Sequence, residues 1–203
     1  MPELTSEQTD ALTELINIGV GRAANVLNEL TESHIVLKVP SIKLYSFDEL
    51  DILSERFGDL PLAAVTQNFN GDYDGRAALL FPTESALNLV EGITGEEPEA
   101  DDIDAIQSAT LRELGNIVIN ALLGTISNML EGNLQFDLSE YRQDHIKGLI
   151  PTQEYNDPDG FILLSEVHFQ IEKLNINGHI ILTFDVENLN TLFKMIKQVF
   201  EEG

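Results

Sequence analysis

Apolar side chains recur at helical spacing along two long segments of the chain, and this pattern predicts two long amphipathic helices. Thr5 or Ser6 can cap the first helix, which we expect to end near Thr31. The second helix is predicted over about 103–131, because Gly132 follows it. The apolar positions of the first helix are Leu12, Leu15, Ile16, Ile18, Ala23, Val26, Leu27 and Leu30.

Alternation of apolar and polar residues predicts strands in both halves of the chain. The predicted strands cover 34–39, 41–47, 62–68, 75–81, 161–172 and 176–184. The segment NGDYDG, residues 70–75, predicts a hairpin turn, and Asn177 and Gly178 are interpreted as a turn between the last two strands. Residues 50–59 have an ambiguous pattern and are interpreted as a loop, and 141–150 are interpreted as a looser region.

Two shorter helices are predicted after the strand pairs. Pro82 suits a first helical turn, so a helix is expected from there to about Ile93, and a final helix is expected over about 186–201. Between the halves, residues 94–104 carry Pro98 and six acidic side chains. This composition is typical of a solvated connector.

Two blocks of sequence occur twice, in the same order. Residues 14–30 (ELINIGVGRAANVLNEL) align with 113–130 (ELGNIVINALLGTISNML), and 75–90 align with 178–193. The offsets are 99 and 103 residues, so an insertion of four residues in the second half reconciles them. The pattern indicates an internal duplication.

The length of the chain favours a single domain. A chain of 203 residues with 43% hydrophobic residues can bury a sizeable core, and two interdependent repeats share it. We therefore expect one α+β domain over 1–203. It would contain two pseudo-twofold repeats of a helix-plus-antiparallel-sheet unit, 1–99 and 100–203.

Charge and composition narrow the set of partners. The 11 Lys and Arg residues stand against 35 Asp and Glu residues, and the formal net charge of -24 would repel a phosphate backbone, so no nucleic acid is expected. The absence of cysteine excludes disulfides, thiolate nucleophiles and cysteine-ligated zinc. The N-terminus is acidic and polar, and no apolar stretch reaches the roughly 18 residues that span a bilayer. We expect a cytoplasmic protein without membrane insertion.

The candidate chemistry lies in a Glu-x-x-Asn pair that both long helices carry. Glu14 and Asn17 on the first helix correspond to Glu113 and Asn116 on the second. Residues three apart share one helix face, so a carboxylate and an amide project side by side. An amide donates and accepts hydrogen bonds and can hold a water molecule in a chosen direction, although neither group is a good nucleophile. Exposed Glu and Asn are usually solvated surface, and this alternative stays open.

The sequence around the first pair is more selective. Asp10, Glu14, Asn17 and Pro40 form an Asp-x3-Glu-x2-Asn-x22-Pro signature, which NIGVGRAA continues. With the internal repeat, this signature resembles the CheC family of chemotaxis aspartyl-phosphate phosphatases, within a superfamily that includes CheX and FliY types. Two Glu/Asn helices in one chain favour the CheC type. The resemblance covers essentially the whole chain.

The resemblance implies a fold, an activity and partners. It implies a protein phosphatase that hydrolyses the aspartyl phosphate of a CheY-type receiver. Glu14 and Glu113 would engage a receiver lysine, and Asn17 and Asn116 would orient the attacking water. It implies no cofactor of the chain's own, with Mg2+ expected on the receiver, and CheD as a further partner. A catalytically weak adaptor that binds the receiver or CheD through the same helices is the alternative, and a metal-dependent hydrolase that uses clustered carboxylates is a third.

The second copy departs from the signature. Ala109 stands four residues before Glu113, and Ser139 stands where Pro40 stands in the first copy, so the first site is the safer assignment. Other features have structural readings. The glycines of the long helices are expected at close helix contacts, the Asp-rich turns at hairpins, and the four scattered histidines outside any metal site.

Overall fold

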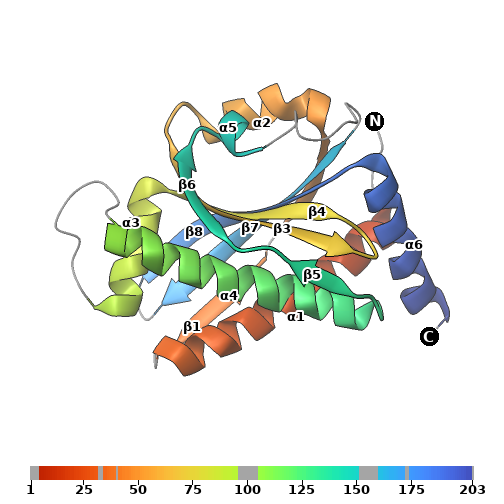
Figure 1. Ribbon diagram of the computed structural model, residues 1–203, viewed down its shortest axis with the longest axis horizontal. Helices are drawn as coiled ribbons and strands as arrows, with labels where there is room; N and C mark the ends of the chain where they lie inside the picture. Colours follow the sequence, from red (N-terminus) through yellow and green to blue (C-terminus); the bar gives the residue numbers. More distant parts are fainter. Residues whose placement is uncertain are drawn as a thin grey trace.

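The computed structural model describes residues 5–31, 34–39, 41–95, 105–150, 160–171 and 174–202. Helices lie on both faces of one curved sheet (Figure 1). The first half contains α1 (Ser6–Thr31), β1 (Ile35–Lys38), β2 (Ile42–Ser46), a 3-10 turn (Phe47–Glu49), α2 (Leu50–Phe57), β3 (Leu62–Gly71), β4 (Gly75–Pro82) and α3 (Thr83–Thr94). The second half contains α4 (Ala105–Met129), β5 (Leu134–Phe136), β6 (Glu140–Asp144), α5 (Ile146–Leu149), β7 (Phe161–Ile171), β8 (Leu174–Phe184) and α6 (Val186–Glu202).

All strand pairs in the sheet are antiparallel, and both halves contribute strands to it. The order is β1-β7-β8-β4-β3-β5, with β2 also on β7 and β6 also on β3. The two short strands of each half therefore pair with a long strand of the other half. If β1–β4 are exchanged with β5–β8, one for one, the strand order is the same order read from the other edge of the sheet. The predicted α+β class is confirmed, whereas the duplication itself stays a prediction that this symmetry supports.

Local hydrogen bonds explain where α1 begins and where α4 ends. The amide of Gln8 donates to Thr5 Oγ1 at 3.2 Å, and the amide of Thr5 donates to Gln8 Oε1 at 3.0 Å. These reciprocal bonds satisfy donors that the first turn leaves open, so the predicted cap at Thr5 is confirmed. At the end of α4, the amide of Gly132 donates to the carbonyl of Ser127 at 2.8 Å, and Ser127 Oγ donates to the carbonyl of Gly132 at 2.8 Å.

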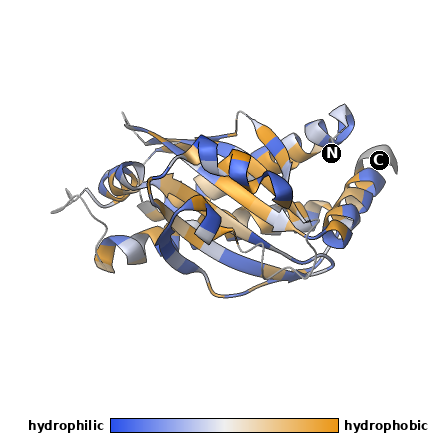
Figure 2. Cartoon of the chain, turned by 90° about the horizontal axis from the view of Figure 1, so that it is seen from above, coloured by the Kyte–Doolittle hydropathy of each residue, from blue (hydrophilic) through white to orange (hydrophobic). Residues whose placement is uncertain are grey.

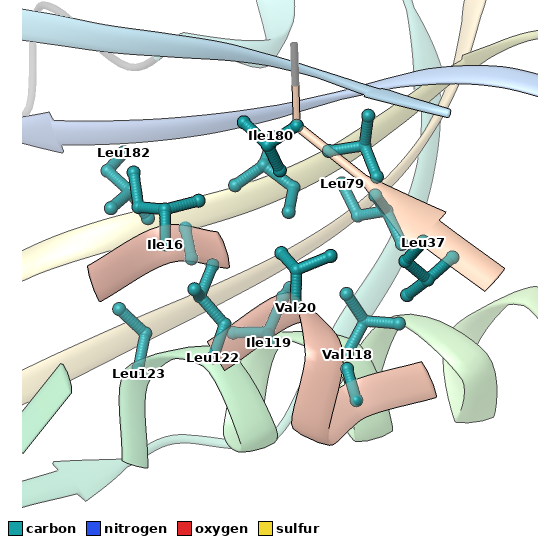
Figure 3. Close-up of a cluster of buried hydrophobic side chains, with 14 of the residues drawn as sticks. Ile16, Val20, Leu37, Leu79, Val118, Ile119, Leu122, Leu123, Ile180 and Leu182 are labelled. Atoms are coloured by element: carbon teal, nitrogen blue, oxygen red, sulfur yellow. The ribbon is translucent and has the colours of Figure 1, made fainter. Parts of the chain in front are cut away.

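The core has two parts, one on each side of the sheet. The larger part lies between the sheet and the helices α1 and α4, and Figure 3 shows side chains of these helices and of the strands pointing toward one another. Its members include Ile16, Val20, Leu37, Leu79, Val118, Ile119, Leu122, Leu123, Ile180 and Leu182. The smaller part lies between the opposite sheet face and the helices α2 and α5, and Leu53 is fully buried there. Seen from above, the helices carry both polar and apolar segments, and apolar residues prevail along the central strands (Figure 2).

Three predictions from the sequence are wrong. Residues 50–57 form helix α2, not a loop, because Leu53 on this helix fills the smaller core. The region 141–150 contains most of β6, which pairs with β3, and helix α5. Asn177 and Gly178 lie inside β8, opposite His168 and Val167, and not in a turn. A side chain at Gly178 would meet the ring of Phe81, so tight packing requires glycine there.

Several predictions fall on residues outside the described part of the chain. These are the bend at Pro40, most of the 94–104 connector including Pro98, and the second Asp-rich turn before Gly160. Within the described residues, no helix combines the length and the apolar character needed to cross a bilayer.

Candidate functional site on helices α1 and α4

Helix α1 presents the first pair on its outer face. Glu14 and Asn17 are exposed, whereas Leu15 and Ile16 between them are fully buried against the sheet. The helical period explains this separation, because positions one and two residues after Glu14 turn to the opposite side of the helix. Both polar side chains are therefore accessible to another molecule.

Helix α4 presents the second pair less openly. Glu113 is exposed, and Asn116 is half-buried, while Leu114 and Val118 are buried. Gly115 lies between the two polar residues and allows α4 to approach β3. A methyl group added there would lie 2.5 Å from Val65 Cβ, so any larger residue would push the helix away from the sheet.

The two helices pack directly against each other and run in roughly opposite directions (Figure 1). At Gly19, α1 comes close to the backbone of α4. A methyl group added at Gly19 would lie 2.7 Å from Leu122 Cδ1 and 2.9 Å from Leu122 Cα. With a rise of 1.5 Å per residue, this contact sets Asn17 and Asn116 about 12 Å apart along the helix axes. The structure therefore brings the two helices together but leaves two separate Glu/Asn sites.

The surroundings of the two asparagines differ. In α4, Asn120 Nδ2 donates to Asn116 Oδ1 at 2.9 Å, which turns the amino group of Asn116 away from Asn120. In α1, the residue that corresponds to Asn120 is Gly21, which has no side chain, and a methyl group there would have nothing within 4 Å. The amide of Asn17 is thus not held in this way. The role of Asn120 depends on the fold, although an asparagine one turn after Asn116 is visible in the sequence.

One of the exposed apolar side chains of α1, Ile18, adjoins the first pair. Ile18 is 36% exposed, Val26 is 40% exposed and Leu30 is 64% exposed, so the sequence pattern that placed them on the apolar stripe of α1 is wrong for these three. Ile117 flanks Asn116 in the same way that Ile18 flanks Asn17, and it is partly buried. Singly exposed apolar residues are common on protein surfaces, so only Ile18, which adjoins Asn17, adds apolar area to the candidate site.

The chemistry available at these sites is positioning. Each site offers one carboxylate and one amide. Neither Glu/Asn pair includes a serine, a histidine or a lysine. Among the described residues, no group of three His, Asp or Glu side chains lies close enough to hold a metal ion. A carboxylate can pair with a cation of a partner, and an amide can align a water molecule.

The other features that the sequence singled out have structural explanations. Gly19 and Gly115 lie at close contacts as expected, but Gly21 and Gly124 face open space, so the prediction is wrong for these two. In the first Asp-rich hairpin, Asp72 accepts a hydrogen bond from the amide of Asn133, which ties the turn to the end of α4.

Two of the four histidines lie near each other, on β7 and β8. His168 Nδ1 is 2.5 Å from Asn177 Oδ1, and His179 stacks edge-on with Phe57. Burial, followed by the nearby Arg56 guanidinium, lowers the pKa of His179 and favours its neutral form. This pair lies on the sheet face opposite α1 and α4, and its contacts are structural.

Comparisons with known proteins support the family resemblance. The chain is 26% identical over 200 residues to the CheY-P phosphatase CheC of Bacillus subtilis, and the match covers 94% of each protein. No family model matches the chain.

Two solved structures have the same fold. FliY of Thermotoga maritima superposes with a TM-score of 0.80 at 16% identity, over 97% of this chain and 98% of that one. CheX, in a CheX-CheY-BeF3-Mg2+ complex from Borrelia burgdorferi, superposes with a TM-score of 0.51 at 17% identity, over 85% of this chain and 99% of that one. The resemblance to the CheC family that the Glu/Asn signature indicated is therefore confirmed along nearly the whole chain, in sequence and in fold.

Proposed function

We propose that this chain is a cytoplasmic protein phosphatase that accelerates hydrolysis of the aspartyl phosphate on a CheY-type receiver. The observation that carries the proposal is the presentation of Glu14, Asn17 and Glu113 to solvent, with Asn116 partly accessible, on two adjacent helices of a chain similar to a CheY-P phosphatase. Buried pairs would have ruled this function out. The solvated-surface alternative loses weight because the accessible pairs recur on both helices.

The proposed division of labour follows from the side chains. Asn17 and Asn116 would align the attacking water with the phosphorus, because an amide can accept one of the water's hydrogens while leaving its lone pair directed at the phosphoryl group. Glu14 and Glu113 would pair with a receiver lysine and fix the orientation of docking. The receiver would bring its own phosphorylated aspartate and Mg2+, so this chain needs no nucleophile and no cofactor.

Docking would use the apolar residue beside the first pair. Ile18 adjoins Asn17 on α1 and is 36% exposed, so it offers area that water solvates poorly. CheD remains a proposed second partner, on the strength of the family resemblance alone.

The second candidate function is an adaptor that binds a receiver without turning it over. The close superposition on FliY, a protein of another type within the superfamily, keeps this candidate open. Turnover separates the two. A phosphatase at a concentration far below that of the receiver accelerates many cycles of phosphate release, whereas an adaptor changes only the fraction of receiver that it occupies.

The test is phosphate release from a panel of phosphorylated receivers with the chain at substoichiometric concentration. The double variant Asn17→Ala/Asn116→Ala is expected to lose most of the acceleration, about a hundredfold, because water is no longer positioned. Each single variant is expected to lose only the share of its own site, with the larger share at Asn17. Glu14→Ala is expected to act chiefly by weakening receiver binding.

Asn25→Ala is the matched control, because Asn25 is an exposed asparagine on the same helix, outside both pairs. This variant is expected to retain full activity. Full acceleration by the double variant would overturn the assignment of the two asparagines. Stoichiometric protection of the phosphorylated receiver by the wild-type chain would favour the adaptor.

A further inference from the structure

Arg22 is the only basic residue of α1, and neither the Glu/Asn pairs nor the core uses it. Its side chain is exposed and forms no hydrogen bond or ion pair within the part of the chain that the structure describes. On a helix, an arginine pairs with an acid three or four residues away, but positions 18, 19, 25 and 26 carry Ile, Gly, Asn and Val. The exposed acidic residues of α1 lie at other positions, and they are Glu7, Asp10, Glu14 and Glu29. The guanidinium of Arg22 is therefore available to a partner.

Arg22 lies on the exposed face of α1, on the flank that is nearer α4. Gly19 faces the backbone of Leu122 on α4, and each residue turns an α-helix by about 100°. Arg22 is therefore about 60° around the helix from this contact, whereas Asn17 is about 160° from it. Ile18 lies between Arg22 and Asn17 on the same face. A protein that covers this face meets an amide, an isoleucine and a guanidinium.

Along the helix axes, Arg22 lies between the two Glu/Asn sites. It follows Asn17 by five residues, which is about 7.5 Å, and long helical side chains lean toward the N-terminus of their helix, here toward Asn17. With Gly19 opposite Leu122, the levels of Arg22 and Asn116 differ by about 4.5 Å. A standard protein interface covers about 800 Å² of each partner, the area of a disc with a radius of about 16 Å. A protein that docks on either site therefore also covers Arg22.

Once Arg22 is covered, the chemistry of the partner decides whether the complex is stable. A guanidinium that loses water without gaining an acceptor destabilises the complex, whereas a carboxylate opposite it forms charge-assisted hydrogen bonds. The receiver in the proposed function carries Mg2+, which proteins hold through carboxylates, so acidic groups surround its phosphorylated aspartate. The four acidic residues of α1 would repel these groups, and Arg22 is the one charge on this helix that attracts them.

We infer that Arg22 is a specificity-determining residue of the docking surface, and that it pairs with a carboxylate of the receiver beside the phosphorylated aspartate. This inference rests on the proposed function. Arg22 takes no part in positioning the water; it favours receivers with an acidic side chain in reach and disfavours receivers with a neutral or basic one there. The corresponding position of α4 is Ala121, so one guanidinium serves both sites.

The experiment measures docking and turnover separately on the same panel of CheY-type receivers. Docking is measured by isothermal titration calorimetry with receivers that carry Mg2+ and beryllofluoride in place of the phosphoryl group, and turnover by phosphate release. Arg22→Gln is expected to weaken binding and to raise KM about tenfold, while kcat at saturating receiver stays within about twofold. The same rise in KM is expected in the Asn17→Ala and Asn116→Ala backgrounds, because Arg22 lies inside both footprints. Arg22→Lys is expected to recover part of the affinity, since it restores the charge without the planar fork.

Salt dependence separates an ion pair from a structural effect. When sodium chloride is raised from about 0.1 M to about 1 M, the difference between the wild type and Arg22→Gln should shrink to about threefold or less. Arg142→Gln is the matched control for the loss of one arginine. Arg142 is half-exposed on β6 and pairs with Ala64, a residue of the smaller core, so it lies on the sheet face away from α1. This variant is expected to bind and turn over the receiver as the wild type does.

The outcomes distinguish this inference from the proposed function. Wild-type affinity and KM in Arg22→Gln, with turnover intact, would overturn the role of Arg22 and leave the phosphatase proposal standing. So would an equal loss in Arg142→Gln, or a rise in KM in only one of the two single-site backgrounds. Binding that depends on Arg22 without any turnover would overturn the phosphatase and support the docking role. Failure of every receiver to bind the wild-type chain would overturn both.

Discussion

Replacing Gly19 by alanine is expected to destabilise the protein, whereas the same replacement at Gly21 is expected to stabilise it. Both glycines lie within α1, two residues apart, so both variants gain about 1 kcal/mol of helix propensity. They differ in what the new methyl group meets. At Gly19 it meets the backbone of Leu122, and at Gly21 it meets nothing within 4 Å.

The magnitude follows from the distances. A methyl group at Gly19 would lie 2.9 Å from Leu122 Cα, whereas carbon atoms in contact prefer about 3.5–4.0 Å. Because a backbone atom cannot rotate away, α1 and α4 must separate by several tenths of an ångström, and overpacking of this kind costs about 1–3 kcal/mol. The helix propensity is common to both variants, so it cancels from their difference. We expect Gly19→Ala to be less stable than Gly21→Ala by about 1–3 kcal/mol.

The assay is equilibrium urea denaturation followed by circular dichroism, with the slope of the transition compared between variants. For a chain of this size, the expected difference corresponds to roughly 2–4 °C in Tm for each kcal/mol. Gly124→Ala, at the second open glycine, provides a control on α4 and should also stabilise. Equal stability of Gly19→Ala and Gly21→Ala would refute the close approach of the two helices.

Three further predictions concern other parts of the chain. Asn120→Ala, combined with Asn17→Ala so that only the second site works, is expected to lower the remaining phosphate release about fivefold, the equivalent of one hydrogen bond to Asn116. Burial lowers the pKa of His179, so below about pH 6.5 the folded state binds fewer protons than the unfolded chain. The stability to urea should therefore fall between pH 7.5 and pH 5.5, and it should fall more in the wild type than in His179→Asn. Leu53→Ala should cost about 2–5 kcal/mol in the same denaturation assay, yet leave phosphate release intact in the folded protein, because Leu53 lies across the sheet from the Glu/Asn helices.

The long helices and the hairpin of β3 and β4 could be predicted because their signals are local. In α1, the apolar period and the Thr5 cap lie within a few residues of each other, and they fix both the helix and the outward direction of Glu14 and Asn17. The presentation of the candidate site thus follows from the helical period alone.

The errors arise where distant contacts decide the structure. Helix α2 is only eight residues long and has one fully buried residue, Leu53, so its period is too short to recognise. β5 has three residues and exists because β3 supplies its hydrogen-bonding partners. Asn177 and Gly178 have the composition of a turn, but the pairing with β7 and the ring of Phe81 hold them in a strand.

The same limit applies to the details of the sites. Ile18 and Val26 fit an apolar stripe, but α4 covers only one side of α1 and leaves them exposed. The direction of the hydrogen bond from Asn120 to Asn116 depends on side-chain geometry that spacing alone does not encode.

The crossed placement of the short strands has a consequence for how the chain can be divided. Because β1 and β2 lie on β7 while β5 and β6 lie on β3, neither half completes its own sheet. Fragments produced by cutting between Gly95 and Ala105 should each expose unpaired strand edges and aggregate when expressed alone. When the two fragments are co-expressed, each should supply the strands that the other lacks, as the subunits of a domain-swapped dimer do.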